Sequence, residues 1–219
     1  MNRFEQVKGM EMPDAKKYLT ELLGDKAEIL FEELRVTVKA AEVEVGAVIK
    51  YGGIEWVVLE CRRWSDSVLV VAKDCLFEAE FDGDNENNWA DSPLRDFLND
   101  FADDESCTVN QLRGIKRSDL VMFERDLTTD DGMTDYGKCK DYISLYTCDE
   151  YRRFRKLIPN CGKWHWTITG DSIVYSYFVR DVSSDGSLNS STACDGAWGV
   201  RPLCNLKSDT LVEVISWGK

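Results

Sequence analysis

The sequence contains a single histidine, His165, among its 219 residues. One imidazole excludes every site that needs two or more, such as a three-histidine or HExxH zinc centre. Runs rich in lysine or arginine are also lacking, and 27 basic against 40 acidic side chains give a formal net charge of −13. Because affinity for nucleic acid comes from clustered cations, we expect no nucleic-acid partner.

Long apolar segments are missing as well. No stretch approaches the ~18 uninterrupted apolar residues of a membrane-spanning helix, so we expect no membrane span. The N-terminal segment MNRFEQVKGMEMPDAKK has no apolar core of a secretory signal. This favours a cytoplasmic location, where thiols stay reduced. An export route without such a signal, such as release with a phage particle, stays open.

The eight cysteines show no C-x2-C spacing, which zinc sites built from thiolates normally use for two of their ligands. Their nearest neighbours in sequence are Cys139 and Cys148, nine apart, and Cys194 and Cys204, ten apart. We therefore expect no metal and no cofactor, and interpret the cysteines as small buried hydrophobic residues.

Motifs of the common catalytic classes are absent too: there is no GxSxG, P-loop or GxGxxG sequence. A Cys–His or Ser–His nucleophile pair would have to use His165, which lies between two tryptophans on an expected strand. Side chains alternate between the faces of a strand, so His165 points away from both rings. We interpret it as a hydrogen-bonded or surface histidine, and no catalytic residue is predicted.

What remains is an acidic chain, 43% apolar, long enough for one large domain with an appendage. Residues 1–42 are expected to form a helical N-terminal appendage, since apolar residues from Leu19 to Val38 roughly keep a helical spacing of three or four residues. Gly24-Asp25 interrupts this pattern and favours two helices. They could pack on the body or associate with a partner, which would make the chain a homo-oligomer.

From residue 43 to 219 the pattern indicates an α+β domain. Two β-type runs, Val45–Tyr51 and Ile54–Cys61, flank Gly52-Gly53, and Val68–Ala72 supplies a third, which predicts an antiparallel meander. One helix is predicted to begin at Pro93 with Ser92 as its cap, and another after Thr147, where Thr147 and Glu150 form a capping box. Further strands are predicted around Trp164–Thr169, Val174–Val179 and Leu211–Trp217.

Six spaced segments resemble a known group of proteins. They are Gly53-Ile-Glu-Trp-Val-Val-Leu59, Asn88-Trp-Ala-Asp-Ser-Pro-Leu-Arg95 with Leu98-Asn99, Asp141-Tyr-Ile-Ser-Leu145, Trp164-His-Trp166, Asp185-Gly186 and Gly199-Val-Arg-Pro-Leu203. In order and spacing the set is similar to a bacterial domain family of unknown function. That family shares the C-type-lectin-like fold with formylglycine-generating enzymes and with target proteins of diversity-generating retroelements. The similarity covers roughly residues 43–217.

The resemblance implies a C-type-lectin-like domain with two helices beside small antiparallel sheets. It also implies a loop-rich binding surface ahead of the GVRP segment, here from Trp166 to Trp198. Tyrosine, tryptophan, serine and asparagine are typical of adaptable binding surfaces. The predicted ligand-binding residues are accordingly Trp166, Tyr175, Tyr177, Asn189, Ser190 and Trp198.

These observations favour a non-enzymatic domain, prophage- or surface-associated, that binds a protein or a glycan. Two alternatives stay open. One is a thiol- or metal-dependent enzyme of the formylglycine-generating branch, for which Cys194 and Cys204 are the rough candidates, although their spacing differs from that family's. The other is a structural subunit whose N-terminal helices set the oligomeric state. Arg201 and Arg95 are interpreted as structural.

Overall fold

The computed structural model describes residues 17–18, 20–22, 24, 37–62, 66–102, 106–196 and 198–218. Residues 17–18 and 20–22 are helical. Gly24 is in a turn, and the other residues of the predicted N-terminal helical appendage, up to residue 36, lie outside the described residues. Residues 37–39 were included in the predicted helix and form a strand instead, because Val38 pairs with Val212 at the edge of a sheet.

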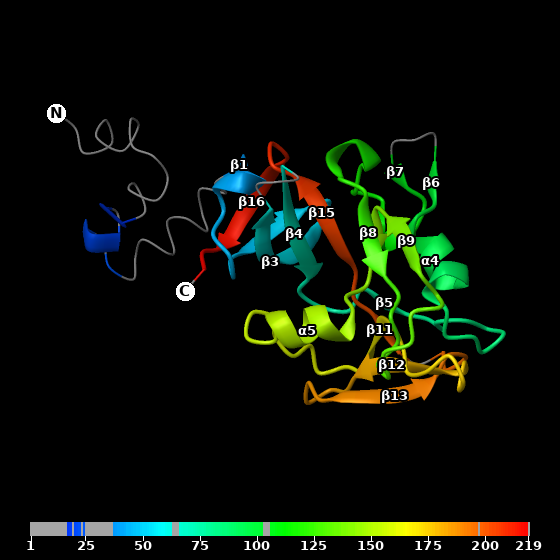
Figure 1. Cartoon of the computed structure of the whole chain (residues 1–219). Coiled ribbons are helices and arrows are strands. Elements are labelled where there is room, and N and C mark those ends of the chain that lie inside the picture. The colour runs from blue at the N-terminus through cyan, green and yellow to red at the C-terminus, as the bar shows by residue number, and fades with distance from the viewer. Residues whose placement is uncertain are drawn as a thin grey trace.

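The larger sheet has seven strands within the described residues, and every pair of neighbours is antiparallel (Figure 1). Its centre is the predicted meander, in which Gly52 and Gly53 both have positive φ, as a tight primed turn requires. In spatial order the strands are β1 (Thr37–Lys39), β16 (Leu211–Ser216), β2 (Val48–Tyr51), β3 (Ile54–Arg62), β4 (Ser67–Ala72), β15 (Leu203–Lys207) and β10 (Ile143–Ser144).

The second sheet has five strands in the described part of the chain, and it carries most of the predicted binding segment. Only β11 and β14 pair in parallel; the other neighbours are antiparallel. Figure 1 shows its edge strand β13 on the opposite side of the molecule from β1 and β16. The order is β13 (Leu188–Thr192), β12 (Phe178–Val182), β11 (His165–Gly170), β14 (Gly199–Val200) and β5 (Phe77–Glu78).

Short elements complete the α+β, sheet-rich fold. From residue 37 to 218 the described α-helices are α4 (Pro93–Leu98) and α5 (Cys148–Phe154), both at predicted positions. The two-stranded ribbons are β6 (Phe101–Ala102) with β7 (Ser106–Cys107) and β8 (Phe123–Asp126) with β9 (Lys138–Asp141). The 3-10 turns are η1 (Ala40–Glu42), η2 (Trp89–Asp91), η3 (Asn110–Leu112) and η4 (Arg117–Asp119). None of the described helices has the length and apolar character needed to cross a membrane.

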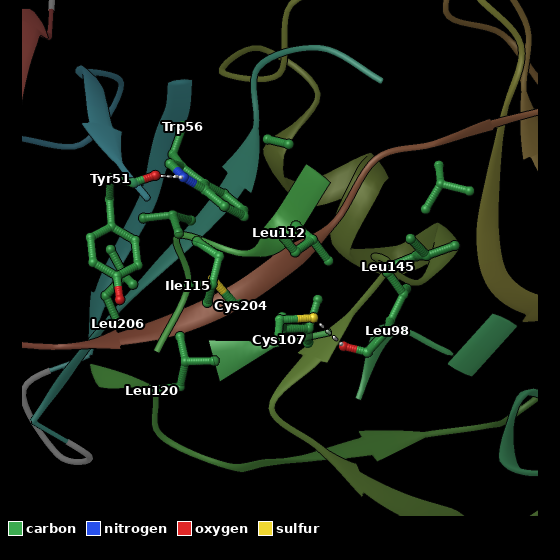
Figure 2. Packing of buried hydrophobic residues seen from close by; sticks show 14 of the residues in the cluster. Tyr51, Trp56, Leu98, Cys107, Leu112, Ile115, Leu120, Leu145, Cys204 and Leu206 are labelled. Carbon is green, nitrogen blue, oxygen red and sulfur yellow. Dashed lines mark hydrogen bonds between the residues drawn. The ribbon is translucent and has the colours of Figure 1, made fainter. Parts of the chain in front are cut away.

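Two hydrophobic clusters cover the two faces of the larger sheet. All six residues of β4 are buried, because alternate side chains enter different clusters: Val68 and Val70 one, Leu69 and Val71 the other. The second cluster includes Tyr151 and Phe154 of α5. Figure 2 shows the first cluster, with Trp56, Leu112, Ile115, Cys204 and Leu206 among its members.

A buried carboxylate joins two of the sequence segments on which the resemblance depends. Asp141, 1% exposed, accepts hydrogen bonds from Trp89 Nε1 at 2.8 Å and Arg95 Nε at 2.7 Å. Beside it, Asn99 Oδ1 accepts from the backbone N–H groups of Tyr142 and Ile143 at 2.9 and 3.1 Å. Charge-assisted bonds of this kind are the strong ones, so the Trp89–Asn99 segment is held firmly against Asp141–Ile143.

Arg201 of the GVRP segment is the other buried anchor, as the sequence indicated. Its guanidinium, 1% exposed, donates to three backbone carbonyls: Ala72 at 2.8 Å, Lys73 at 2.6 Å and Pro159 at 2.9 Å. These carbonyls belong to the end of β4 and to the loop after α5. One side chain therefore fastens two segments that are far apart in the chain.

Replacement of Arg201 by lysine is expected to lower the free energy of unfolding by about 3 kcal/mol, because one ammonium cannot satisfy three carbonyls that the guanidinium fork reaches. Urea denaturation followed by tryptophan fluorescence measures the loss. Arg113→Lys, at an exposed arginine, is the matched control and should change stability by less than about 0.5 kcal/mol. Equal stability of the two variants would contradict the structural role of Arg201.

Candidate functional site

The two predicted tryptophans belong mainly to the interior. Trp166 is 0% exposed and donates Nε1–H to the carbonyl of Ala79 at 2.9 Å, so it is a core residue and offers no surface to a ligand. Trp198 is partly buried, stacks on Trp164 with ring centroids 5.0 Å apart, and meets the edge of Trp166. Among the described residues, no ring contact joins Trp198 to the predicted tyrosines.

The two predicted tyrosines do lie on the surface, and they lie together. Tyr175 is 56% exposed and Tyr177 41% exposed, with ring centroids 6.3 Å apart in an edge-to-face arrangement. The ring of Tyr177 also packs against that of Phe178, the first residue of β12, with the ring centroids 4.5 Å apart. Three adjacent rings therefore form a continuous aromatic row.

Asn189 and Ser190 lie on opposite faces of edge strand β13. Ser190 is paired with Arg180 and Asn189 with Asp181, and successive side chains of a strand point in opposite directions. Ser190 Oγ accepts a bond from Arg180 Nη1 at 2.7 Å and donates to Asp171 at 2.7 Å. Ser190 is thus on the face that carries Phe178 and Arg180, whereas Asn189 is on the other.

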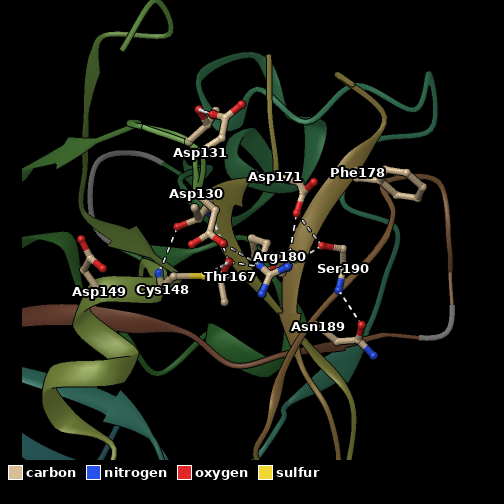
Figure 3. Close-up of polar contacts among 12 residues, drawn as sticks. Asp130, Asp131, Cys148, Asp149, Thr167, Asp171, Phe178, Arg180, Asn189 and Ser190 are labelled. Atoms are coloured by element: carbon tan, nitrogen blue, oxygen red, sulfur yellow. Dashed lines mark hydrogen bonds and ion pairs between the residues drawn. The ribbon is translucent and has the colours of Figure 1, made fainter. Parts of the chain in front are cut away.

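An ionic network begins beside Phe178, whose carbonyl accepts from the Asp171 N–H at 2.9 Å, and Figure 3 shows Asp171, Arg180 and Ser190 in it. Arg180 approaches Asp171 at 3.2 Å and Asp130 at 3.4 Å, and Asp130 also accepts from Arg152 of α5 at 2.8 Å. We call the combined set the aromatic–ionic surface; it consists of Tyr175, Tyr177, Phe178, Asp171, Arg180 and Ser190. Because Asp171, Arg180 and Ser190 bond to one another, these three side chains hold fixed positions on the surface.

A buried asparagine holds the loop that carries the tyrosines. Asn87 is 0% exposed, and its Nδ2 donates to the carbonyls of Ser172 at 2.9 Å and Phe178 at 2.8 Å, with Tyr175 at 3.4 Å. Its Oδ1 accepts from the Tyr136 hydroxyl at 2.7 Å. These bonds satisfy the loop carbonyls. The strand predicted from Val174 therefore begins only at Phe178, since residues 174–177 form a clamped loop.

A second constellation, which the sequence interpretation missed, brings two thiols and the imidazole together. Cys75 Sγ lies 3.4 Å from Cys161 Sγ, and Cys161 Sγ lies 3.5 Å from His165 Nδ1. All three atoms are within 4.8 Å of one another. Both cysteines are partly exposed, and His165 is buried. We call these three residues the thiol–imidazole cluster.

The hydrogen bonds of His165 fix the orientation of its ring. Nδ1 lies 2.9 Å from the carbonyl oxygen of Lys163, which can only accept, so Nδ1 carries the proton. Nε2 then accepts from the hydroxyl of Tyr146, whose pKa burial raises well above its ordinary value. As predicted, His165 and Trp166 occupy opposite faces of β11: Trp166 enters the first hydrophobic cluster, and His165 contacts Tyr146 of the second.

The contact between the two thiols, in which either sulfur can be the donor, shifts their pKa values in opposite directions. The hydrogen bond with Cys75, together with His165, lowers the pKa of Cys161. The same bond and burial raise the pKa of Cys75. Cys161 is therefore the more acidic of the two sulfurs, and a lowered pKa favours the thiolate, which is the reactive form of cysteine.

The GVRP segment positions this cluster. The Arg201 guanidinium donates to the carbonyls of both Lys73 and Pro159. Lys73 is two residues before Cys75, and Pro159 is two residues before Cys161, so Arg201 holds the segments of both cysteines together. At Gly199 an added Cβ would lie 2.6 Å from Cys75 Sγ, so only glycine leaves room for that thiol. Gly199 also pairs with His165 across β11 and β14.

The cysteine pair considered from the sequence does not exist as a site. Cys204 is 0% exposed within the core of the larger sheet, as Figure 2 shows, whereas Cys194 is exposed in the loop after β13. The observed pair, Cys75 and Cys161, is 86 residues apart in the chain. The one available signal was the spacing Cys161-x3-His165, which places a thiol close to the only imidazole.

Comparison with known proteins gives one similarity. Residues 121–208 match the model of a family described as a domain of unknown function (DUF6273). That range includes β8 to β15, and with them the aromatic–ionic surface, Cys161, His165 and Arg201. No curated protein and no solved structure matched the chain.

Iodoacetamide is expected to modify Cys161 of the reduced, chelator-treated protein at pH 6, at least about tenfold faster than the same cysteine in urea. The lowered pKa keeps the thiolate present, whereas an ordinary thiol with a pKa near ~8.5 is almost fully protonated there. Peptide mapping by mass spectrometry measures the rate, and Cys161→Ser should remove the signal. A rate that rises between pH 6 and 9 along an ordinary thiol curve would contradict the assignment.

Proposed function

We propose that this chain is a non-enzymatic recognition domain of C-type-lectin-like architecture that binds a protein or glycan ligand on its aromatic–ionic surface. The compact arrangement of two short helices beside small antiparallel sheets supports that architecture. The six spaced sequence segments support it as well, since bonds of Asp141, Asn99 and Arg201 join three of them to each other or to the rest of the fold.

The observation that carries the proposal is the clamp of Asn87 on the tyrosine loop. Exposed aromatic rings normally lose conformational freedom on binding, which weakens affinity. Here the backbone beneath Tyr175 and Tyr177 is already fixed by bonds from a fully buried amide. Preorganised tyrosines of this kind supply large contact area at low entropic cost.

The charged half of the aromatic–ionic surface would fix the orientation of a bound ligand. Asp171, Arg180 and Ser190 form a closed set of hydrogen bonds next to Phe178. Carboxylate, guanidinium and hydroxyl groups held in fixed positions can bond to the polar groups of a peptide or the hydroxyls of a sugar while the rings pack on the apolar parts. Trp166 is excluded from this surface by burial, and Trp198 and Asn189 lie apart from it.

Replacement of both tyrosines, Tyr175→Ala with Tyr177→Ala, is expected to weaken binding to a ligand found on protein or glycan arrays by at least tenfold, the loss typical of aromatic hot spots. Leu211→Ala is the matched control, since Leu211 is 64% exposed on β16 of the other sheet. It should bind as the unaltered protein does. Equal affinity of the double variant and the control for every array ligand would refute this surface.

A further inference from the structure

We propose that Cys75, Cys161 and His165 form a binding site for a single zinc-class metal ion, through two sulfur atoms and Nδ1. This site is separate from the aromatic–ionic surface and does not depend on the recognition function proposed above. It replaces the expectation from the sequence that the chain has no metal ligand set. Zn²⁺ is the ion whose ligand preferences and geometry match the three side chains.

The distances between the three donor atoms fit a tetrahedral ion. With Zn–S near 2.3 Å and Zn–N near 2.0 Å, two sulfur ligands are about 3.8 Å apart, and sulfur and nitrogen about 3.5 Å. Here the two Sγ atoms are 3.4 Å apart, and Cys161 Sγ is 3.5 Å from Nδ1. Small side-chain rotations therefore bring all three donors to one point.

The surroundings of the imidazole suit a ligand role. A zinc-bound histidine usually donates its other ring N–H to a fixed acceptor, which sets the ring orientation. Tyr146 is fully buried and bonded to Nε2, and its hydroxyl can accept as well as donate. Binding requires the tautomer that carries its proton on Nε2, which then donates a hydrogen bond to the Tyr146 oxygen. Nδ1 gives up its bond to the Lys163 carbonyl and offers its lone pair to the ion.

The three ligands are held by the fold before any ion arrives. Cys75 follows β4, Cys161 follows α5, and His165 begins β11, so they come from three separate segments. Arg201 fastens the first two segments, and Gly199 leaves space for the Cys75 side chain. Such a rigid arrangement is what a metal site requires, since ordering of the ligands is already complete.

Three protein ligands leave one tetrahedral position for water or an incoming donor. Cys75 and Cys161 are partly exposed, so solvent can reach the site. An open fourth position distinguishes catalytic and exchangeable sites from closed structural sites. The inferred site thus holds an exchangeable ion, whose loss leaves the fold intact.

A disulfide between Cys75 and Cys161 is the competing outcome. A disulfide bond requires about 2.05 Å between sulfurs and an oxidant that accepts two electrons. Metal binding requires only that thiol protons pass to solvent. The experiment therefore separates the two by using reduced protein.

The test titrates Co²⁺, and then Zn²⁺ as competitor, into the full-length chain after reduction and chelator treatment. The expected result is about one equivalent of Co²⁺, with thiolate-to-metal charge-transfer absorption and the visible bands of a tetrahedral ion, all removed by Zn²⁺. Cys75→Ser and Cys161→Ser should each abolish the charge-transfer band at one equivalent. Cys194→Ser, at an exposed cysteine elsewhere, should leave spectrum and affinity unchanged.

Tyr146→Phe tests the positioning role of the hydroxyl and is expected to weaken zinc affinity by about 10- to 100-fold while the tetrahedral spectrum is kept. Circular dichroism tests whether each variant is folded. If a variant is not folded, the Co²⁺ absorption spectrum of the unaltered chain still shows whether thiolates bind the ion. Three results would overturn the proposal: no charge-transfer band in the reduced chain, an unchanged band in both cysteine variants, or quantitative disulfide formation in place of metal uptake.

Discussion

The arrangement of both sheets depends on the hydrogen bonds of the buried Arg201 guanidinium. It has no carboxylate partner among its described bonds and instead satisfies three backbone carbonyls, two at the end of β4 and one in the loop after α5. Burial of an arginine is costly unless its donors are used, so the chain must bring those carbonyls together. The larger sheet is thereby attached to the loop that leads into β11 of the smaller one.

Asp141 is a second buried polar anchor. Asp141 joins Trp89 and Arg95, so the segment around η2 and α4 is fixed against β9 and β10. Asn87, two residues before Trp89, then clamps the tyrosine loop. The aromatic–ionic surface and the thiol–imidazole cluster thus share one principle: a buried polar side chain bonds to backbone carbonyls of an irregular segment, so that a more exposed group keeps a defined position.

The sequence predicted well those features that depend on local chemistry. The Gly52-Gly53 turn and its strands, the Thr147–Glu150 capping box and the face of His165 follow from residue types a few positions apart. Even here tertiary contacts override local signals: the Ser92 hydroxyl, predicted to cap α4, donates to the Phe81 carbonyl instead.

Features that depend on distant contacts could not be predicted. Residues 174–177 have strand-like composition but form a loop, because Asn87, nearly ninety residues earlier, bonds their neighbouring carbonyls. Trp166 and Tyr175 are equally plausible surface rings from the sequence, and only the packing of the core separates them. The thiol–imidazole cluster needs Cys75 and Cys161, which no spacing rule connects.

The central claim is that buried anchors place two thiols and one imidazole around a common point. Zinc-edge X-ray absorption of the full chain loaded with one equivalent of Zn²⁺ tests it most directly. The account predicts two sulfur neighbours near 2.3 Å, one imidazole nitrogen near 2.0 Å and one further light atom. A shell of oxygen and nitrogen alone, or one with four sulfurs, would contradict it.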